Sequence, residues 1–92
     1  MDIGKPYKDI EVTDSYVIRE FSHNIDPIEL LWHRDDEERI IEVLTCGDNW
    51  MMQQDNCLPT ILHEKMTLHI PKHNWHRAIK GQGVLRVKIH KL

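Results

Sequence analysis

Val84-Leu85-Arg86-Val87-Lys88-Ile89-His90-Lys91 is the stretch of this sequence that decides the fold most clearly. Its apolar residues alternate with polar or charged ones at every second position. This is the pattern of a β-strand that buries one face and leaves the other in water. The preceding Gly81-Gln82-Gly83 indicates a turn. The chain is therefore predicted to end in a half-buried strand.

Shorter runs of strand-forming residues, separated by turn residues, precede this stretch. Two neighbouring runs enclose the acidic residues 36–38, and we expect them to form a hairpin with those residues at its turn. About eight short strands at regular spacing predict an all-β jelly-roll barrel. The expected strands cover residues 16–21, 28–35, 39–46, 50–54, 60–62, 67–70, 75–80 and 84–91.

A helix over residues 28–44, capped by Asp26-Pro27, is the alternative for this part of the chain. Its apolar stripe would begin at Ile28 and Leu31 but would next meet Asp35 and Arg39. Because no continuous apolar face results, the sequence favours strands.

Length and composition bound the domain organisation. The chain has 92 residues, of which 40% are hydrophobic and 29% charged, so we expect one globular domain over residues 1–92. Its core should span approximately residues 14–91, with residues 1–13 as an N-terminal arm or edge strand. The start of the sequence has no apolar stretch typical of a secretory signal, so a cytoplasmic location is expected. Cys46 and Cys57 are then expected to be reduced thiols.

Charge is distributed unevenly along the chain. Residues 1–55 contain 14 acidic and 5 basic residues, whereas residues 56–92 contain 1 acidic and 7 basic residues. The basic half suggests nucleic-acid binding, but strands from the two halves of a small β-fold lie side by side and can neutralise each other. We therefore expect no nucleic-acid partner and no membrane association.

The segment His33-Arg34-Asp35 opens a spacing that resembles the first motif of the cupins, which are small jelly-roll barrels. That motif contains two histidines, an acidic metal ligand and a glycine. Here His33, Asp35, Ile40 and Gly47 fall on its spacing. Asp35 stands in place of the second histidine and Ile40 in place of the glutamate, so the match is partial.

The segment Pro71-Lys72-His73-Asn74-Trp75-His76 is similar to the second cupin motif. His73 stands where that motif has a glycine, Lys65 where an earlier glycine occurs, and His76 keeps the metal-ligand position. The resemblance covers approximately residues 28–90 and implies a small jelly roll whose two motifs face each other across the barrel. The chain also resembles short cupin-like proteins of phages and bacteria, in which case the host cytoplasm is its expected location.

A metal site is the chemistry that these residues predict. Side chains two apart on a strand share a face, so His33 and Asp35 can reach one cation. With His76, they supply two imidazoles and a carboxylate, a set that suits Fe, Mn, Ni or Zn. Glu42 is a possible fourth ligand if Ile40, rather than its neighbour, faces inward. A hydrogen-bonded His-Asp surface pair is the plainer alternative.

Other residues are candidates for holding a ligand. Gln53 could hydrogen-bond a polar molecule, and Trp50 could stack on one, although a core position would explain the tryptophan equally well. Arg77, like Arg34 and Arg39, could hold a carboxylate or phosphate, or could neutralise nearby acidic residues.

Two functions follow from this reading. The first is a metal-dependent pocket that binds or transforms a small polar molecule, such as a sugar derivative or an organic acid. The second is a non-catalytic binding module that recognises a ligand or a host protein. A homodimer is expected in either case, because so short a domain gains stability by burying apolar strands against a copy of itself.

Overall fold

The computed structural model describes residues 7–26 and 30–92. In this part of the chain the structure is all-β, with eight strands and no helix, as the sequence predicts. No described helix could therefore span a membrane. The strands are β1 (Lys8–Val12), β2 (Tyr16–Phe21), β3 (Arg39–Thr45), β4 (Met51–Gln54), β5 (Thr60–Ile61), β6 (Thr67–Ile70), β7 (His76–Ile79) and β8 (Leu85–Lys91).

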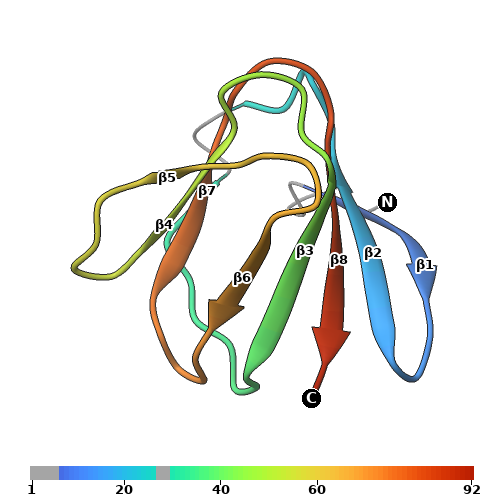
Figure 1. Cartoon of the computed structure of the whole chain (residues 1–92), viewed down its shortest axis with the longest axis vertical. Coiled ribbons are helices and arrows are strands. Elements are labelled where there is room, and N and C mark those ends of the chain that lie inside the picture. Colours follow the sequence, from blue (N-terminus) through green and yellow to red (C-terminus); the bar gives the residue numbers. More distant parts are fainter. Residues whose placement is uncertain (1–6, 27–29) are drawn as a thin grey trace.

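The strands form two antiparallel sheets. The larger sheet has the order β1-β2-β8-β3-β6, and the smaller has the order β5-β4-β7. Figure 1 shows the smaller sheet on the left and the larger one on the right, with the chain passing between them at both ends. Side chains from the facing surfaces of the two sheets point into the space between them, which is the architecture of a jelly roll.

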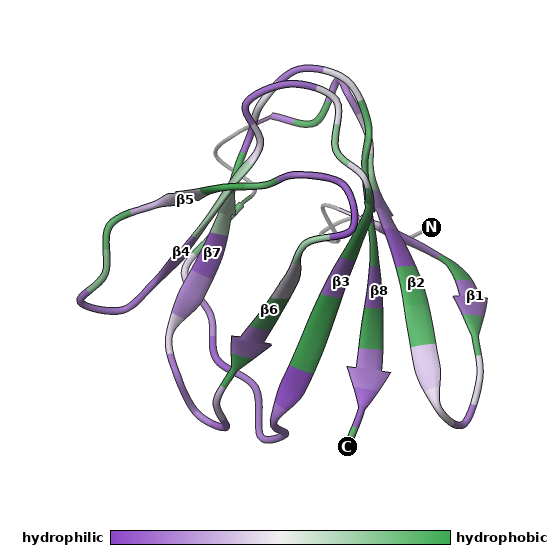
Figure 2. Ribbon diagram, viewed as in Figure 1, coloured by the Kyte–Doolittle hydropathy of each residue, from purple (hydrophilic) through white to green (hydrophobic). Residues whose placement is uncertain are grey.

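β8 confirms the strand predicted from its alternating sequence and lies between β2 and β3 in the larger sheet. Its apolar residues Leu85, Val87 and Ile89 are buried, whereas the residues between them are half-buried. Figure 2 shows this alternation of hydrophobic and hydrophilic residues along β8, whereas β3 is hydrophobic over most of its length. On β3, Ile41 and Val43 are the buried residues, so Ile40, Glu42 and Leu44 face outward.

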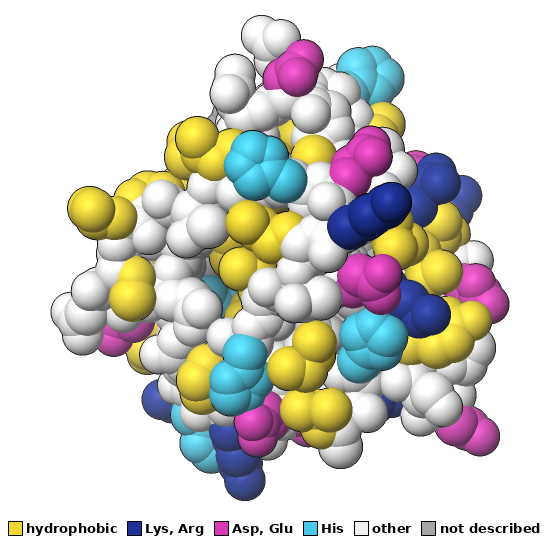
Figure 3. All heavy atoms as spheres, viewed as in Figure 1, with side chains coloured by type: hydrophobic (Ala, Val, Ile, Leu, Met, Phe, Trp, Pro, Cys, Tyr) yellow, Lys and Arg dark blue, Asp and Glu magenta, His cyan; other side chains and the backbone are white. Residues whose placement is uncertain are grey.

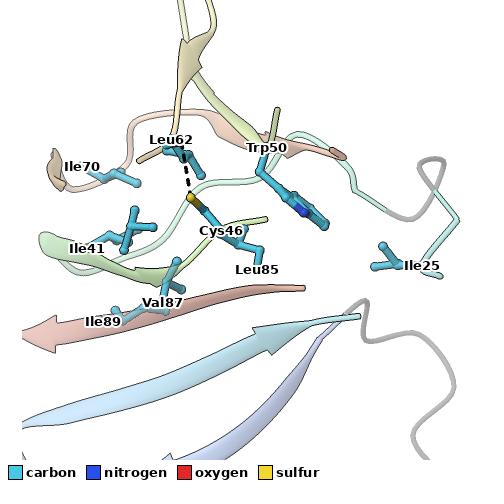
Figure 4. Packing of buried hydrophobic residues seen from close by; sticks show 10 residues of the cluster. Ile25, Ile41, Cys46, Trp50, Leu62, Ile70, Leu85, Val87 and Ile89 are labelled. Carbon is cyan, nitrogen blue, oxygen red and sulfur yellow. Dashed lines mark hydrogen bonds between the residues drawn. The ribbon is translucent and has the colours of Figure 1, made fainter. Parts of the chain in front are cut away.

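The core is a cluster of apolar side chains around Trp50, which is 0% exposed (Figure 4). Its indole Nε1 donates a hydrogen bond to the carbonyl oxygen of Gly83 at 3.0 Å, which satisfies the one polar group of the ring. The Sγ of Cys46 donates to the carbonyl oxygen of Leu62 at 3.5 Å. Cys46 and Cys57 are both free thiols.

The predicted hairpin between residues 28–35 and 39–46 is wrong. β3 pairs with β6 on one side and with β8 on the other, so its backbone has no free edge for a third partner. Residues 30–35 instead cross to the smaller sheet and form one isolated bridge there, between His33 and His76. The start of the predicted strand, at Ile28, lies outside the described residues.

Several turns depend on left-handed backbone conformations. Lys65 has a φ of 69° and His73 a φ of 63°, a region in which glycine is the residue with least strain. Gly47 also has a positive φ, of 49°, and a Cβ atom there would lie 2.1 Å from the carbonyl oxygen of Gln82. The chain thus passes close to itself at Gly47, where only glycine fits.

Candidate metal centre

A cavity of about 400 Å³ lies between the two sheets. Most of its wall is apolar and comes from five strands, and its charged and imidazole groups come from β2, β3, β7 and the segment before β3. The lining residues are Tyr7, Arg19, Phe21, Leu30, Leu31, His33, Arg34, Asp35, Arg39, Ile41, Met52, His76, Ala78, Leu85, Val87 and Ile89.

His33, Asp35 and His76 meet at this cavity, with one potential ligand atom of each lying within 4.8 Å of the other two. Backbone pairing brings them together. The amide of His33 donates to the carbonyl of His76 at 3.0 Å, and the reverse bond is 2.9 Å long. The amide of His73 donates to the carbonyl of Asp35 at 2.8 Å. Residues far apart in the sequence are therefore fixed opposite each other.

Both imidazoles present the same ring nitrogen to the site. Nδ1 of His33 lies 3.0 Å from the carbonyl oxygen of Leu31, and Nδ1 of His76 lies 2.8 Å from that of Asn74. A carbonyl oxygen only accepts, so each Nδ1 carries the proton and donates it. Each Nε2 keeps its lone pair when the ring is neutral. Histidines that bind metals are oriented by such bonds from their second nitrogen.

The Oδ2 atom of Asp35 is buried, and no group in residues 7–26 and 30–92 gives it a hydrogen bond. It lies 3.4 Å from Nε2 of His76 and 3.6 Å from a guanidinium nitrogen of Arg39. A buried carboxylate oxygen without a donor is costly, and a neutral Nε2 beside it offers only another lone pair. A cation held by both atoms would satisfy them, so the donor set fits a divalent metal.

The environment of His76 favours the neutral ring that a metal requires. Its side chain is 5% exposed, and this burial is the main cause that lowers the pKa of His76. The charges on His33 and Arg39 lower it further, against the Asn74 carbonyl and Asp35, which raise it. Burial penalises the imidazolium form, so the ring is neutral near pH 7.

Glu42, the possible fourth ligand, is not brought to this site. It lies on the outer face of β3, where its carboxylate is 3.2 Å from Nε2 of His90. Ile40 also faces outward, so the inward positions of this strand are Arg39, Ile41 and Val43. Within the described residues, the group that could hold a metal consists of two histidines and one aspartate.

The three predicted ligand-binding residues do not line the cavity. Arg77 lies on the outer face of β7 and donates from Nε and Nη2 to Oε1 of Gln53, at 3.0 and 2.8 Å. Its guanidinium also lies over the ring of Trp32, 4.8 Å from the ring centroid. Trp50 is part of the buried core. The alternation of side chains along β4 and β7 turns Gln53 and Arg77 away from the cavity, toward which Met52 and His76 point.

Sequence reasoning missed Arg19 and the apolar wall of the cavity. Arg19 belongs to β2, and the wall residues Phe21, Leu30 and Met52 are spread over distant parts of the chain. The signal available for Arg19 was the alternation along its strand, which puts it on the same face as Phe21. Arg19 is opposite Val87, one of the inward-facing residues of β8.

Comparisons with known proteins identify the fold. Neither models of protein families nor curated proteins match the sequence. Solved structures match in shape at low sequence identity. An RmlC-like cupin with a double-stranded β-helix fold from Methanocaldococcus jannaschii has a TM-score of 0.67 and 10% identity, over 98% of this chain and 82% of that one. A cupin domain from Bordetella pertussis has a TM-score of 0.60 and 14% identity, over 94% and 91%.

A third similar structure is the DMSP lyase DddQ from Ruegeria pomeroyi, with a TM-score of 0.67 and 12% identity. The match covers 87% of this chain but only 40% of the lyase, so the chain spans less than half of that enzyme's length. At such identities the comparisons establish the architecture alone. The resemblance inferred from the two partial motifs is confirmed at the level of the fold: this chain is a small, cupin-type jelly roll.

Proposed function

We propose that this protein holds a divalent metal ion with His33, Asp35 and His76 and uses it to bind a small molecule in the adjoining cavity. The observation that carries the proposal is the buried Oδ2 of Asp35, which has no hydrogen-bond donor and faces a lone pair of His76. Three protein ligands leave open positions on a metal, as in sites where a metal meets a substrate or water. Fe, Mn, Ni and Zn all suit this donor set.

The metal would act as a Lewis acid on a bound ligand. The chain itself orients the two imidazoles through the carbonyl oxygens of Leu31 and Asn74 and excludes water with the apolar cavity wall. Either simple binding or a chemical transformation of the ligand fits this arrangement. The DMSP lyase supports the enzymatic form only in that its chain has this fold.

Elemental mass spectrometry of protein purified without an affinity tag or chelator tests the metal. We expect near-stoichiometric metal in the wild type and its loss in a His33→Ala/His76→Ala variant. The matched control is His69→Ala/His90→Ala. It also removes two histidines, but these lie on outer faces and contact Glu38 and Glu42. Figure 3 shows how widely histidines are scattered over one face of the molecule, which makes such a control necessary.

The proposal is wrong if the wild type contains no metal and takes up none of the four ions. Metal content and the midpoint of thermal unfolding measure this uptake. Equal metal content in the two double variants would also contradict it, because binding would then be a property of surface histidines.

A non-catalytic binding module is the second candidate. The observation that favours it is the composition of β3. The cupin motif has a metal-binding glutamate in this region, whereas here β3 turns Arg39 and Ile41 toward the cavity. This candidate predicts that the metal-free protein binds a ligand or a host protein as well as the metal-loaded protein does. The same thermal-unfolding measurement, repeated with and without metal, separates it from the first.

A further inference from the structure

The charged groups of the cavity are mainly positive. Three arginines, Arg19, Arg34 and Arg39, line it together with one carboxylate, that of Asp35. Within the described part of the chain the cavity therefore has an excess of positive charge, which favours an anionic ligand.

Two of these arginines are engaged elsewhere. Arg19 donates from Nε and Nη2 to the two carboxylate oxygens of Asp9, at 2.8 and 3.4 Å, and its guanidinium lies 3.8 Å from the ring centroid of Tyr7. Arg34 is exposed, with its guanidinium 5.2 Å from the ring centroid of Trp75. Neither is free to hold a ligand without breaking or leaving these contacts.

Arg39 differs from both. Its ion pair is with Asp35, at 3.6 Å, a distance and geometry that give no hydrogen bond. Its guanidinium donates no hydrogen bond to an acceptor in residues 7–26 and 30–92. Toward this part of the chain its donors are unused, although its side chain is only 25% exposed. A half-buried guanidinium with unused donors is suited to a carboxylate, which it can bind with two parallel hydrogen bonds.

The metal and Arg39 share one partner, the Oδ2 atom of Asp35. A dication bound there would draw the carboxylate away from Arg39 and would leave positive charge in excess on both the metal and the guanidinium. An anion entering the cavity would offset this excess. Binding of the metal and binding of an anion should therefore favour each other.

The apolar wall of the cavity determines which kind of group the ligand carries besides its anionic group. Phe21, Met52, Leu85, Val87 and Ile89 supply apolar wall from three strands. Such a wall gains free energy by covering hydrocarbon and loses it by covering hydroxyl groups that find no partner. The volume of about 400 Å³ lies toward the low end of ligand pockets, so the ligand is small.

We propose that the cavity takes a small carboxylate with an apolar body, and that Arg39 binds its carboxylate group once a metal occupies Asp35. This inference rests on the proposed function and names the class of its ligand. It favours the organic-acid form of the sequence-based expectation over the sugar form. Arg39 is the specificity-determining residue, because it selects the anionic head group while the wall selects the hydrocarbon.

Isothermal titration calorimetry with hexanoate as the probe tests this pairing. Hexanoate should bind the Zn²⁺-loaded protein at least about 10-fold more tightly than the metal-free protein, since the dication offsets the charge of Asp35 and leaves positive charge for the carboxylate. Hexanol, which lacks the charge, and gluconate, which lacks the apolar body, should each bind at least about 10-fold more weakly than hexanoate.

The Arg39→Gln variant gives a readout that a merely structural role would not. We expect weaker hexanoate binding, by about 10-fold or more, together with roughly 3-fold or more tighter Zn²⁺ binding, because a competing positive charge is removed. Arg39→Lys, which keeps the charge but not the planar fork, should restore part of the hexanoate affinity. Arg86→Gln is the matched control, since Arg86 pairs with Glu20 on the outer face and should change neither affinity.

The possible failures are distinguishable. If Zn²⁺ does not bind the wild type, both the proposed function and this inference are overturned. If Zn²⁺ binds at the three residues but hexanoate binds no better than hexanol, or if Arg39→Gln weakens both affinities, only the inference is overturned.

Discussion

Lys65 adopts a backbone conformation that costs an ordinary residue free energy, with a φ of 69°. Its side chain is exposed, and its amide donates to the carbonyl of Val43 at 2.8 Å, a bond that glycine would keep. Lys65→Gly should therefore raise the free energy of unfolding by about 0.5–1 kcal/mol, the strain relieved being larger than the added entropy of the unfolded chain. Urea unfolding measures this.

Lys72→Gly is the control for that substitution, because it removes the same charge from an exposed turn residue whose φ is not positive. Here the glycine only adds entropy to the unfolded chain, and stability should fall by about 0.5–1 kcal/mol. If Lys65→Gly lowers the free energy of unfolding more than Lys72→Gly does, backbone strain at position 65 is not the cause.

The site could be predicted from the sequence to the extent that its residues follow from spacing. His33 and Asp35 are two positions apart and lie on the same side of their segment, although this segment is held by a single bridge and not by a strand. Glu42, Gln53 and Arg77 could not be placed, because a shift of one residue in register turns a side chain to the opposite face of a sheet. The burial of Trp50 likewise depends on neighbours that are distant in the sequence.

At the scale of elements, the close contact between the turn after β3 and the turn before β8 is the most demanding part of the fold. Asp48 and Gln82 form a bridge there, with hydrogen bonds of 2.8 and 2.7 Å between their backbones. A Cβ atom on Gly47 would meet the carbonyl oxygen of Gln82 at 2.1 Å, and its φ is also positive. Gly47→Ala should lower the free energy of unfolding by more than about 2 kcal/mol.

The Gly83→Ala variant separates the cost of the close contact from the cost of the positive φ. Gly83 also has a positive φ, of 82°, but a Cβ atom there would lie 3.3 Å from the Cα of Gly47, a contact that small shifts relieve. Its loss of stability should be about 1–2 kcal/mol, the cost of the backbone conformation alone. Chemical denaturation of both variants gives the order, and a larger loss at Gly83 would refute the role assigned to the close contact.

The elements themselves were predictable where the apolar alternation was regular, as in β8. The partner of each strand was not. Pairing β3 with the segment before it satisfied local sequence rules, but β3 lies between β6 and β8, which come much later in the chain. Such pairings are decided by how the whole set of strands buries its apolar faces, and a local pattern contains no information about that.

At the scale of the whole molecule, acid should destabilise the metal-free protein through His76, which is 4% exposed. Burial lowers its pKa in the folded state below the value of about 6.5 for an unfolded chain. Between these two pKa values the unfolded chain binds a proton that the folded chain does not. Stability should therefore be greatest above about pH 6.5 and should fall as the pH falls toward the lower folded pKa.

Urea unfolding of the wild type and of His76→Asn, from pH 8 to pH 5 with a chelator present, measures this effect. The asparagine does not titrate, so the variant should lose less stability on acidification than the wild type. Titrating groups that do not interact with His76 contribute equally to both proteins and cancel in the difference. If the wild type and His76→Asn lose the same stability on acidification, the burial of His76 is not the cause of the pH dependence.

The size and the lining of the cavity are properties of the whole molecule that no local pattern could predict. Its walls come from five strands, and its volume depends on the lengths of side chains that meet only after folding. The homodimer and the cytoplasmic location expected from the sequence stay predictions.

The bridge between His33 and His76 joins two stretches of chain that are separated by four of the eight strands, β3 to β6. If both side chains hold one ion, that ion is also a crosslink, comparable in its effect on chain entropy to a disulfide that closes a long loop. Unlike a disulfide, it can be removed by a chelator without any redox reaction. Residues 30–35, which line the cavity, would then be held more firmly when the metal is bound than when it is removed, so that opening of the cavity would depend on metal supply.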